Sequence, residues 1–120
     1  MDSNTTVSAL RKRVEKFRDE RDWGKFHNPK DLSIALTIES SELEEVFLWK
    51  NRTEIGMLSR DNTQLERVAE EMADIAIYLL SLSSVLKVDL SEAIDRKLTQ
   101  NERKYPVDKS KGSSKKYNEL

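Results

Sequence analysis

The stretch that decides the fold, residues 63–87, reads TQLERVAEEMADIAIYLLSLSSVLK. Thr63 and Glu66 have the spacing of a capping box, so we expect a helix that begins there and continues to about Lys87. One side of this helix is an apolar stripe made of Val68, Met72, Ile75, Leu79, Leu82 and Leu86. The opposite side is also apolar and contains Ala73, Ile77 and Leu80. The stretch therefore predicts a helix that is buried on more than one side.

The other elements of a chain of 120 residues can hardly bury the apolar side chains on every side of this helix. A second copy of the chain is the simplest cover for the far side, so we expect a homo-oligomer, either a homodimer or a homotetramer. The alternative is that the tail and a loop of the same chain cover that side. The fold class that follows is all-α, a four-helix bundle completed by oligomerisation.

The rest of the chain predicts three more helices and no strand. We expect helices at about residues 6–21, 29–50 and 89–105, and a loop at 51–62. Asn28 is a good N-cap, and Pro29 suits the first helical position, where its missing N–H is not needed. Asp89 and Glu92 repeat the capping pattern for the last helix, which should end before Pro106. We expect one domain at residues 1–106, followed by a basic, flexible tail at 107–120.

The composition excludes several classes of protein. The net charge of −1 gives no basic field for nucleic acid, so we expect no nucleic-acid partner. The chain has no cysteine, which excludes disulfides and cysteine zinc sites. No apolar run approaches the roughly 20 residues of a membrane span, so we expect no membrane partner. The first residues, MDSNTTVSAL, lack the features of a secretory signal, and we expect a cytosolic, cytoplasmic protein.

Two pairs of carboxylates interrupt the apolar stripes of neighbouring helices. The stripe of the helix at residues 29–50 consists of Leu32, Leu36, Leu43 and Val46. Glu39 lies within this stripe and Glu42 at its edge, while Glu71 and Asp74 have the same spacing on the next long helix. If the two helices pack antiparallel, four like charges converge and repel one another. A divalent cation removes that repulsion, and oxygen ligands of this kind suit Mg²⁺ or Mn²⁺.

Two other interpretations apply to the same carboxylates. Di-iron bundles use Glu-x-x-His pairs, but the only histidine, His27, does not follow a glutamate at that spacing. The second alternative is that Glu39 and Glu71 form ordinary ion pairs with Lys or Arg side chains of other helices. We interpret four further glutamates as solvated surface: Glu44, Glu45, Glu66 and Glu70.

The spacing Glu39-x-x-Glu42 followed by Glu71-x-x-Asp74 resembles that of the MazG-like superfamily of all-α nucleoside triphosphate pyrophosphohydrolases. Three segments are similar to the dCTP pyrophosphatase branch of this superfamily: ERDWGKFHNPKDLSIAL at 20–36, ELEEVFLWK at 42–50 and EEMADIAIYLL at 70–80. The similarity extends over about residues 8–120. It implies the MazG-like form of helical bundle.

The resemblance implies a Mg²⁺-dependent hydrolase with dCTP as the favoured nucleoside triphosphate substrate. Glu39, Glu42, Glu71 and Asp74 would be both the metal ligands and the catalytic residues. Water would attack the α-phosphorus, releasing dCMP and diphosphate, and either Glu42 or Glu71 would accept the proton. The alternatives are the same chemistry on dUTP or modified nucleotides, or a non-catalytic helical oligomer that binds partners.

The resemblance also implies a set of substrate-binding residues: Trp23, Lys25, Phe26, His27, Trp49, Tyr78, Lys97 and Asn101. The two tryptophans and Tyr78 would form the base pocket, and Lys97 and Asn101 would reach phosphate oxygens. From the pattern alone, the aromatic residues would be ordinary packing and Lys97 and Asn101 would be surface.

Two features leave the substrate contacts open. Val14 stands where some relatives have a histidine that contacts the base, so the base preference is not determined. The tail lysines Lys109, Lys111, Lys115 and Lys116 could either close over the triphosphate or remain solvated.

Overall fold

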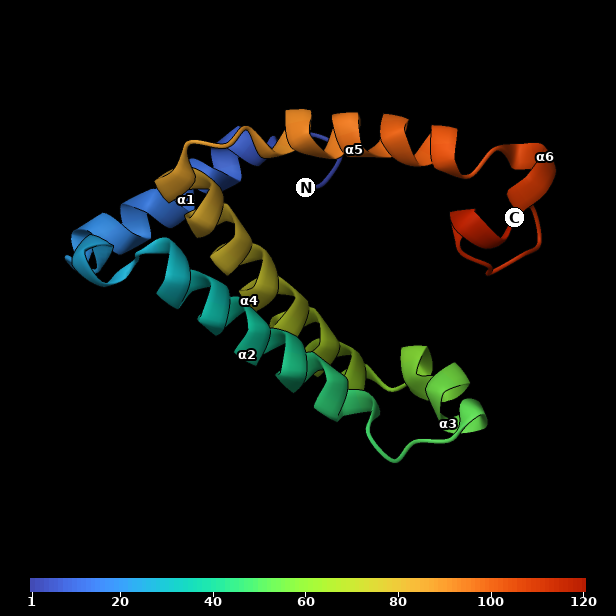
Figure 1. The fold of residues 1–120 in the computed structure, drawn as a ribbon. Helices are drawn as coiled ribbons and strands as arrows, with labels where there is room; N and C mark the ends of the chain where they lie inside the picture. Colours follow the sequence, from blue (N-terminus) through green and yellow to red (C-terminus); the bar gives the residue numbers. More distant parts are fainter. The chain divides into compact units, whose positions relative to one another are not determined.

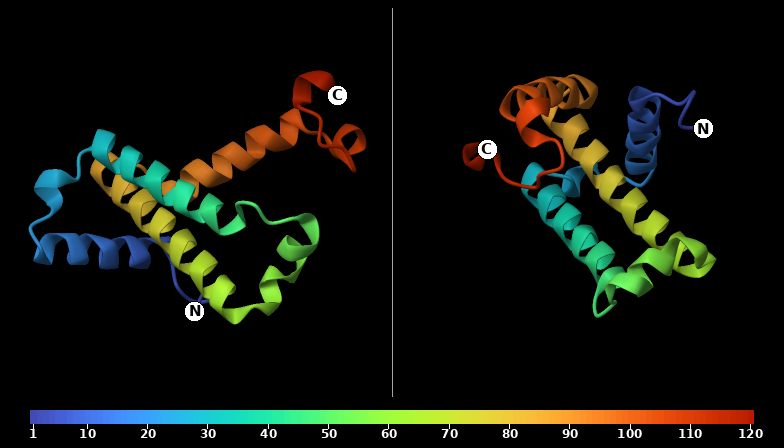
Figure 2. Two further views of the ribbon diagram at one scale, coloured as in Figure 1. Left: turned by 90° about the horizontal axis from the view of Figure 1, so that it is seen from below. Right: turned by 90° about the vertical axis from the view of Figure 1, so that its right-hand side faces the viewer.

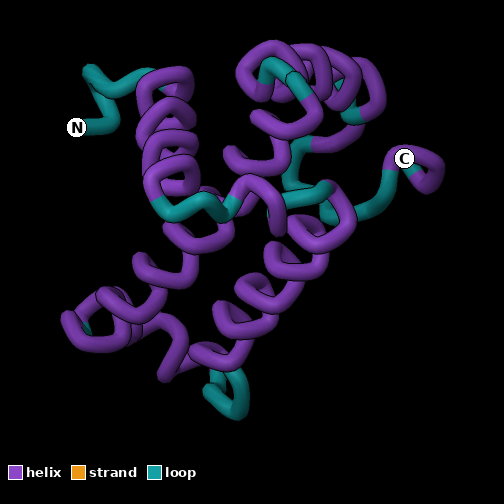
Figure 3. The backbone as a smooth tube through the Cα atoms, turned by 90° about the vertical axis from the view of Figure 1, so that its left-hand side faces the viewer, coloured by secondary structure: helices purple, strands orange, loops and turns teal.

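The computed structural model describes all 120 residues, and every regular element is helical (Figures 1 and 3). The all-α class is therefore confirmed. The chain forms two compact units, residues 1–87 and 88–120. The first unit contains α1 (Val7–Glu20), η1 (Gly24–Phe26), α2 (Pro29–Phe47), α3 (Arg52–Met57), η2 (Leu58–Arg60) and α4 (Asn62–Leu86). The second contains α5 (Leu90–Lys104), α6 (Val107–Ser110) and η3 (Tyr117–Glu119).

Two of the predicted helix starts have the expected capping bonds. The Asn28 side chain accepts a hydrogen bond from the Asp31 N–H at 2.9 Å, and Pro29 opens α2. The Asp89 side chain accepts one from the Glu92 N–H at 2.9 Å and begins α5. In both cases the side-chain oxygen satisfies an amide that the first helical turn leaves unpaired.

The start of α4 differs from the prediction. Asp61 is the N-cap, because its carboxylate accepts a hydrogen bond from the Gln64 N–H at 3.2 Å. Thr63 therefore lies inside the helix, and the predicted capping box with Glu66 is wrong. The physical reason is that an acceptor at Asp61 already satisfies the first free amides.

The segment predicted as a loop contains a helix instead. Asn51 and Glu54 form a reciprocal capping box, in which the Asn51 side chain accepts from the Glu54 N–H at 2.9 Å. This box begins α3, and η2 follows directly. α2 also ends at Phe47 rather than at Lys50, because the backbone of Leu48 is extended with ψ at 134°.

The core of the first unit lies between α2 and α4, which run antiparallel side by side (Figures 1 and 2). The buried apolar residues are Leu32, Val46, Leu58 and Leu80. α1 packs against the other side of α4, where Ser84 Oγ donates to Glu15 Oε1 at 2.7 Å. Met72 and Ile77 remain 57% and 42% exposed, so a single chain does not bury α4 on every side. Completion of the bundle by oligomerisation stays a prediction.

The second unit consists of α5 and a short, folded-back end. α5 ends at Lys104, before Pro106 as predicted. The rings of Tyr105 and Tyr117 meet edge to face with centroids 6.1 Å apart, and Lys104 Nζ lies 4.9 Å from the Tyr117 ring. Residues 107–120 thus contain two short helical turns, while the flexibility of this tail and its boundary at residue 106 stay predictions.

None of the helices has the length and apolarity that crossing a lipid bilayer requires. The cytosolic compartment stays a prediction.

Candidate active site

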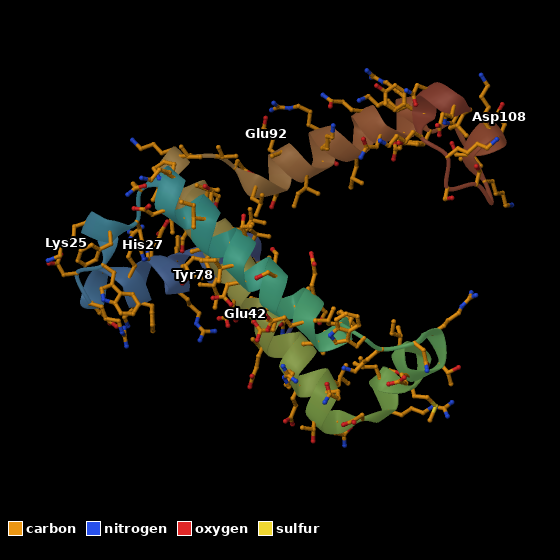
Figure 4. All side chains as sticks on the ribbon, turned by 60° about the horizontal axis from the view of Figure 1, so that its bottom comes forward. Lys25, His27, Glu42, Tyr78, Glu92 and Asp108 are labelled. Atoms are coloured by element: carbon orange, nitrogen blue, oxygen red, sulfur yellow. The ribbon has the colours of Figure 1, made fainter.

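Three predicted carboxylates converge between the two long antiparallel helices. One oxygen from each of Glu39, Glu42 and Glu71 lies within 4.8 Å of the other two. Two of these residues come from one face of α2 and the third from α4; Figure 4 labels Glu42 on the α2 side. Mg²⁺ holds its oxygen ligands at about 2.0–2.1 Å, so its ligand oxygens are at most about 4.2 Å apart. The three oxygens therefore need only small movements to share one ion.

The electrostatics of this cluster favours a cation. Burial raises the pKa of Glu39, and the charge of Glu42 and a hydrogen bond with it raise it further. Burial likewise raises the pKa of Glu71, again followed by the charge of Glu42. A positive ion would lower both values by favouring the ionised carboxylates.

The alternative of ordinary ion pairs does not match the structure. No Lys or Arg side chain forms a salt bridge with Glu39, Glu42 or Glu71. The Glu71 Oε2 atom is buried and has no hydrogen-bond partner. A buried carboxylate oxygen without a partner is costly. This oxygen and the chemistry of the three donors fit a hard divalent cation.

Asp74, the fourth predicted ligand, lies outside the group of three and is exposed. Its charge still contributes to the raised pKa of Glu39 and of Glu71, so it is close enough to act on the cluster. Its role as a metal ligand stays a prediction.

Trp23, Phe26 and His27 are grouped around η1, before α2 begins. Trp23 is 43% exposed and meets Phe17 edge to face, with centroids 5.6 Å apart. The His27 ring lies 6.4 Å from Trp23, and its Nδ1 is buried without a partner. Lys25 forms an ion pair with Asp22 at 3.1 Å. Figure 4 shows Lys25 and His27 at this end of the first unit.

The other predicted contacts lie on different elements. Tyr78 is half-buried on α4, one turn beyond Asp74 (Figure 4). Trp49 follows α2 and is 92% exposed. Lys97 and Asn101 lie on α5, in the second unit. The roles of all eight predicted substrate-binding residues stay predictions.

Sequence reasoning missed an apolar groove of about 450 Å³ between α1 and α4. Its lining residues are Leu10, Arg13, Val14, Phe17, Ala73, Ala76, Ile77 and Leu80. The signal was present, because small alanines on α4 at helical spacing leave room beside the larger side chains of α1. The groove also shows that Val14 faces a shared hollow and not a closed core.

The chain is similar to several known proteins. The model of the MazG-like family matches residues 34–120. The chain is 40% identical to a Bos taurus protein named dCTP pyrophosphatase 1 over 118 residues, which cover 98% of this chain and 70% of the relative. It is 38% identical to the Homo sapiens protein of the same name over 115 residues, which cover 96% of this chain and 68% of that relative.

A solved structure resembles it as well. The crystal structure of a pyrophosphatase from Archaeoglobus fulgidus has a TM-score of 0.76 and 41% sequence identity, covering 83% of this chain and 92% of its own. The family match spans most of the chain and includes all four predicted carboxylates. Together with the relatives, this confirms the resemblance inferred from the carboxylate spacing, and the chain belongs to the MazG-like family.

Proposed function

We propose that this chain is a Mg²⁺-dependent nucleoside triphosphate pyrophosphohydrolase that converts dCTP and water to dCMP and diphosphate. The observation that carries the proposal is the cluster of Glu39, Glu42 and Glu71 oxygens within 4.8 Å of one another. The relatives named dCTP pyrophosphatase 1 support the choice of substrate.

In this reaction a bond forms between a water oxygen and the α-phosphorus, and the bond from that phosphorus to the bridging oxygen of the β-phosphate breaks. Glu39, Glu42 and Glu71 would hold the cation, with Asp74 beside them. Mg²⁺, or Mn²⁺ in its place, supplies the positive charge that neutralises the triphosphate oxygens. Either Glu42 or Glu71 takes the proton that the attacking water loses.

The base would be held by aromatic side chains that flank α2. Because this helix of 19 residues is about 28 Å long, the two rings that flank it would meet the same base only if they came from different copies of the chain in the predicted oligomer. Trp23 stands before this helix and Trp49 after it, and both have exposed ring surface. Stacking on such a ring contributes about 1–3 kcal/mol per base. Tyr78, Lys25, Phe26 and His27 would complete the pocket, and Lys97 and Asn101 would contact phosphate oxygens.

The oligomer predicted from the sequence is part of the proposal. The groove between α1 and α4 is lined mainly by apolar side chains, and Phe17 and Ile77 there are 48% and 42% exposed. A second copy of the chain would remove this apolar surface from water. Light scattering should therefore report a dimer or a tetramer, and a species of 13.9 kDa at high protein concentration would contradict this part.

The test of the activity is diphosphate release from each dNTP and NTP in the presence of Mg²⁺. We expect dCTP to be the preferred substrate and the Glu39→Gln variant to lose activity. Glu44→Gln is the matched control, because Glu44 is exposed on the same helix and outside the cluster. Preference for dUTP would refute only the substrate. Absence of turnover with every nucleotide would leave a non-catalytic helical module as the function.

A further inference from the structure

Trp49 has an unusual backbone conformation for so large a side chain. Its φ is +65°, in the left-handed region that bulky residues rarely occupy. Two other non-glycine residues share this region, but Asp22 is of a type that tolerates it and Lys87 ends α4 at the position where it is common. Trp49 has neither explanation, so its conformation is held by its surroundings.

The surroundings form a type II β-turn over residues 47–50. Leu48 has φ −56° and ψ 134°, as the second residue of such a turn requires. The Lys50 N–H donates to the Phe47 carbonyl at 3.2 Å and closes the turn. The third position, which normally takes Gly or Asn, is Trp49.

Lys50 also fixes this turn through its side chain. Its ammonium group donates to the carbonyl of Val46, one of the free carbonyls in the last turn of α2. The backbone and the side chain of Lys50 thus both bind the end of α2, on either side of Trp49. Two hydrogen bonds from Lys50 therefore fix the backbone on which Trp49 lies.

The strain is not compensated by packing within the chain. The Trp49 residue is 92% exposed, and no aromatic or cation contact involves its ring. A Gly at this position would satisfy the turn without strain. The structure therefore keeps an unfavourable backbone conformation and gains only an indole ring that projects into solvent.

We infer that residues 47–50 form a strained presentation turn, in which Lys50 is a positioning residue that holds the Trp49 ring ready to stack on the base of the nucleotide. This inference rests on the proposed function, since it assumes a base as the occupant. It assigns a role to Lys50, which touches neither the carboxylates nor the substrate in this scheme.

The first test compares melting temperatures, which need no substrate. Trp49→Ala removes the ring and keeps the strain, whereas Trp49→Gly removes both. We expect Trp49→Gly to melt above Trp49→Ala. At the exposed helical position Glu44 the order should be reversed, because Gly is worse than Ala within a helix. If Trp49→Gly melts at or below Trp49→Ala, the turn is not strained and the inference is wrong.

The second test concerns Lys50. Lys50→Met keeps the apolar stem and removes the ammonium group, and Lys50→Arg restores a donor. In a Trp23→Phe background the fluorescence comes from Trp49 alone, and its anisotropy should decay faster in Lys50→Met and recover in Lys50→Arg. Wild-type anisotropy together with wild-type KM in Lys50→Met would overturn the positioning role.

The third test uses kinetics on the otherwise native chain. Both Trp49 variants should raise the KM for dCTP by about 5- to 150-fold, the range expected for losing one stacked base, with little change in kcat. Lys50→Met should raise KM in the same direction. Dissociation of the oligomer by Trp49→Ala with an unchanged KM would overturn the inference, because the ring would then serve a subunit contact. Absence of turnover with any nucleotide refutes the proposed function and, with it, the base as the occupant. The strained turn and the positioning by Lys50 are still decided by the melting order and the anisotropy, which are measured without substrate.

Discussion

Replacing Glu39 by Gln should stabilise the metal-free chain and remove its response to Mg²⁺. Burial and the neighbouring charge of Glu42 raise the pKa of Glu39 in the folded chain. A carboxyl with a raised pKa binds its proton more tightly in the folded state than in the unfolded state. Its contribution to stability is therefore fully present below the unfolded pKa and is lost as the pH rises through the folded pKa. Gln has no charge to lose or gain, so the variant avoids this destabilisation at neutral pH.

The size of the Mg²⁺ response follows from mass action. Free Mg²⁺ at ten times its dissociation constant adds about 1.4 kcal/mol to the free energy of unfolding. Unfolding entropy is about 2.1 cal/mol/K per residue, or about 0.25 kcal/mol/K for the 120 residues. The wild-type melting temperature should therefore rise by about 6 °C, and in Glu39→Gln the rise should fall towards zero.

The assay is thermal unfolding followed by circular dichroism, with a chelator and then with Mg²⁺, at neutral pH. Glu44→Gln is the control and should keep the wild-type response, because its side chain lies outside the cluster. If Glu39→Gln melts below the wild type in chelator and still gains the full shift with Mg²⁺, the cluster is not a metal site and the reasoning fails.

Three further predictions concern the same unit. The melting temperature of the metal-free wild type should fall from acidic to neutral pH, because the pKa of Glu39 and that of Glu71 are both raised in the folded chain. Glu71→Gln should weaken this pH dependence, and a wild-type melting temperature that does not change with pH would contradict the prediction. Leu32→Ala should lower the free energy of unfolding in urea by about 2–5 kcal/mol, because Leu32 is 2% exposed in the core; a measured loss below about 1 kcal/mol would show that its packing is loose. Ser84→Ala should cost about 1 kcal/mol through the bond to Glu15, and the double variant Glu15→Ala/Ser84→Ala should show coupling; strict additivity would mean that the contact contributes nothing.

The sequence predicted the parts of the fold that depend on local patterns. Asn28 and Asp89 cap their helices as expected, because a cap is decided by a few adjacent residues. The prediction for the start of α4 was wrong because two possible capping side chains, Asp61 and Thr63, compete within one helical turn, and Asp61 is the N-cap. The helix α3 was missed although its Asn51-x-x-Glu54 box was readable, because six residues give no clear apolar period.

The candidate site was predictable only in part. Helical spacing places Glu39 beside Glu42, but the approach of Glu71 depends on the antiparallel packing of α2 and α4. The exposure of Trp49 and its left-handed backbone could not be predicted, because both depend on where α2 ends. Long-range geometry of this kind is set by packing and not by the local pattern.

The position of the cluster along α2 explains how the chain tolerates it. Leu32 and Val46, the two most buried residues, each lie about two helical turns from Glu39, one on either side. The apolar contacts that hold α2 against α4 therefore flank the carboxylates and do not depend on them. Repulsion among the glutamates acts on a short central section of α2, and the packing of Leu32 and Val46 holds the helix against α4 on both sides of that section. Because the packing fixes the helices, the repulsion cannot relax by separating them, and it remains available to be relieved by a bound cation.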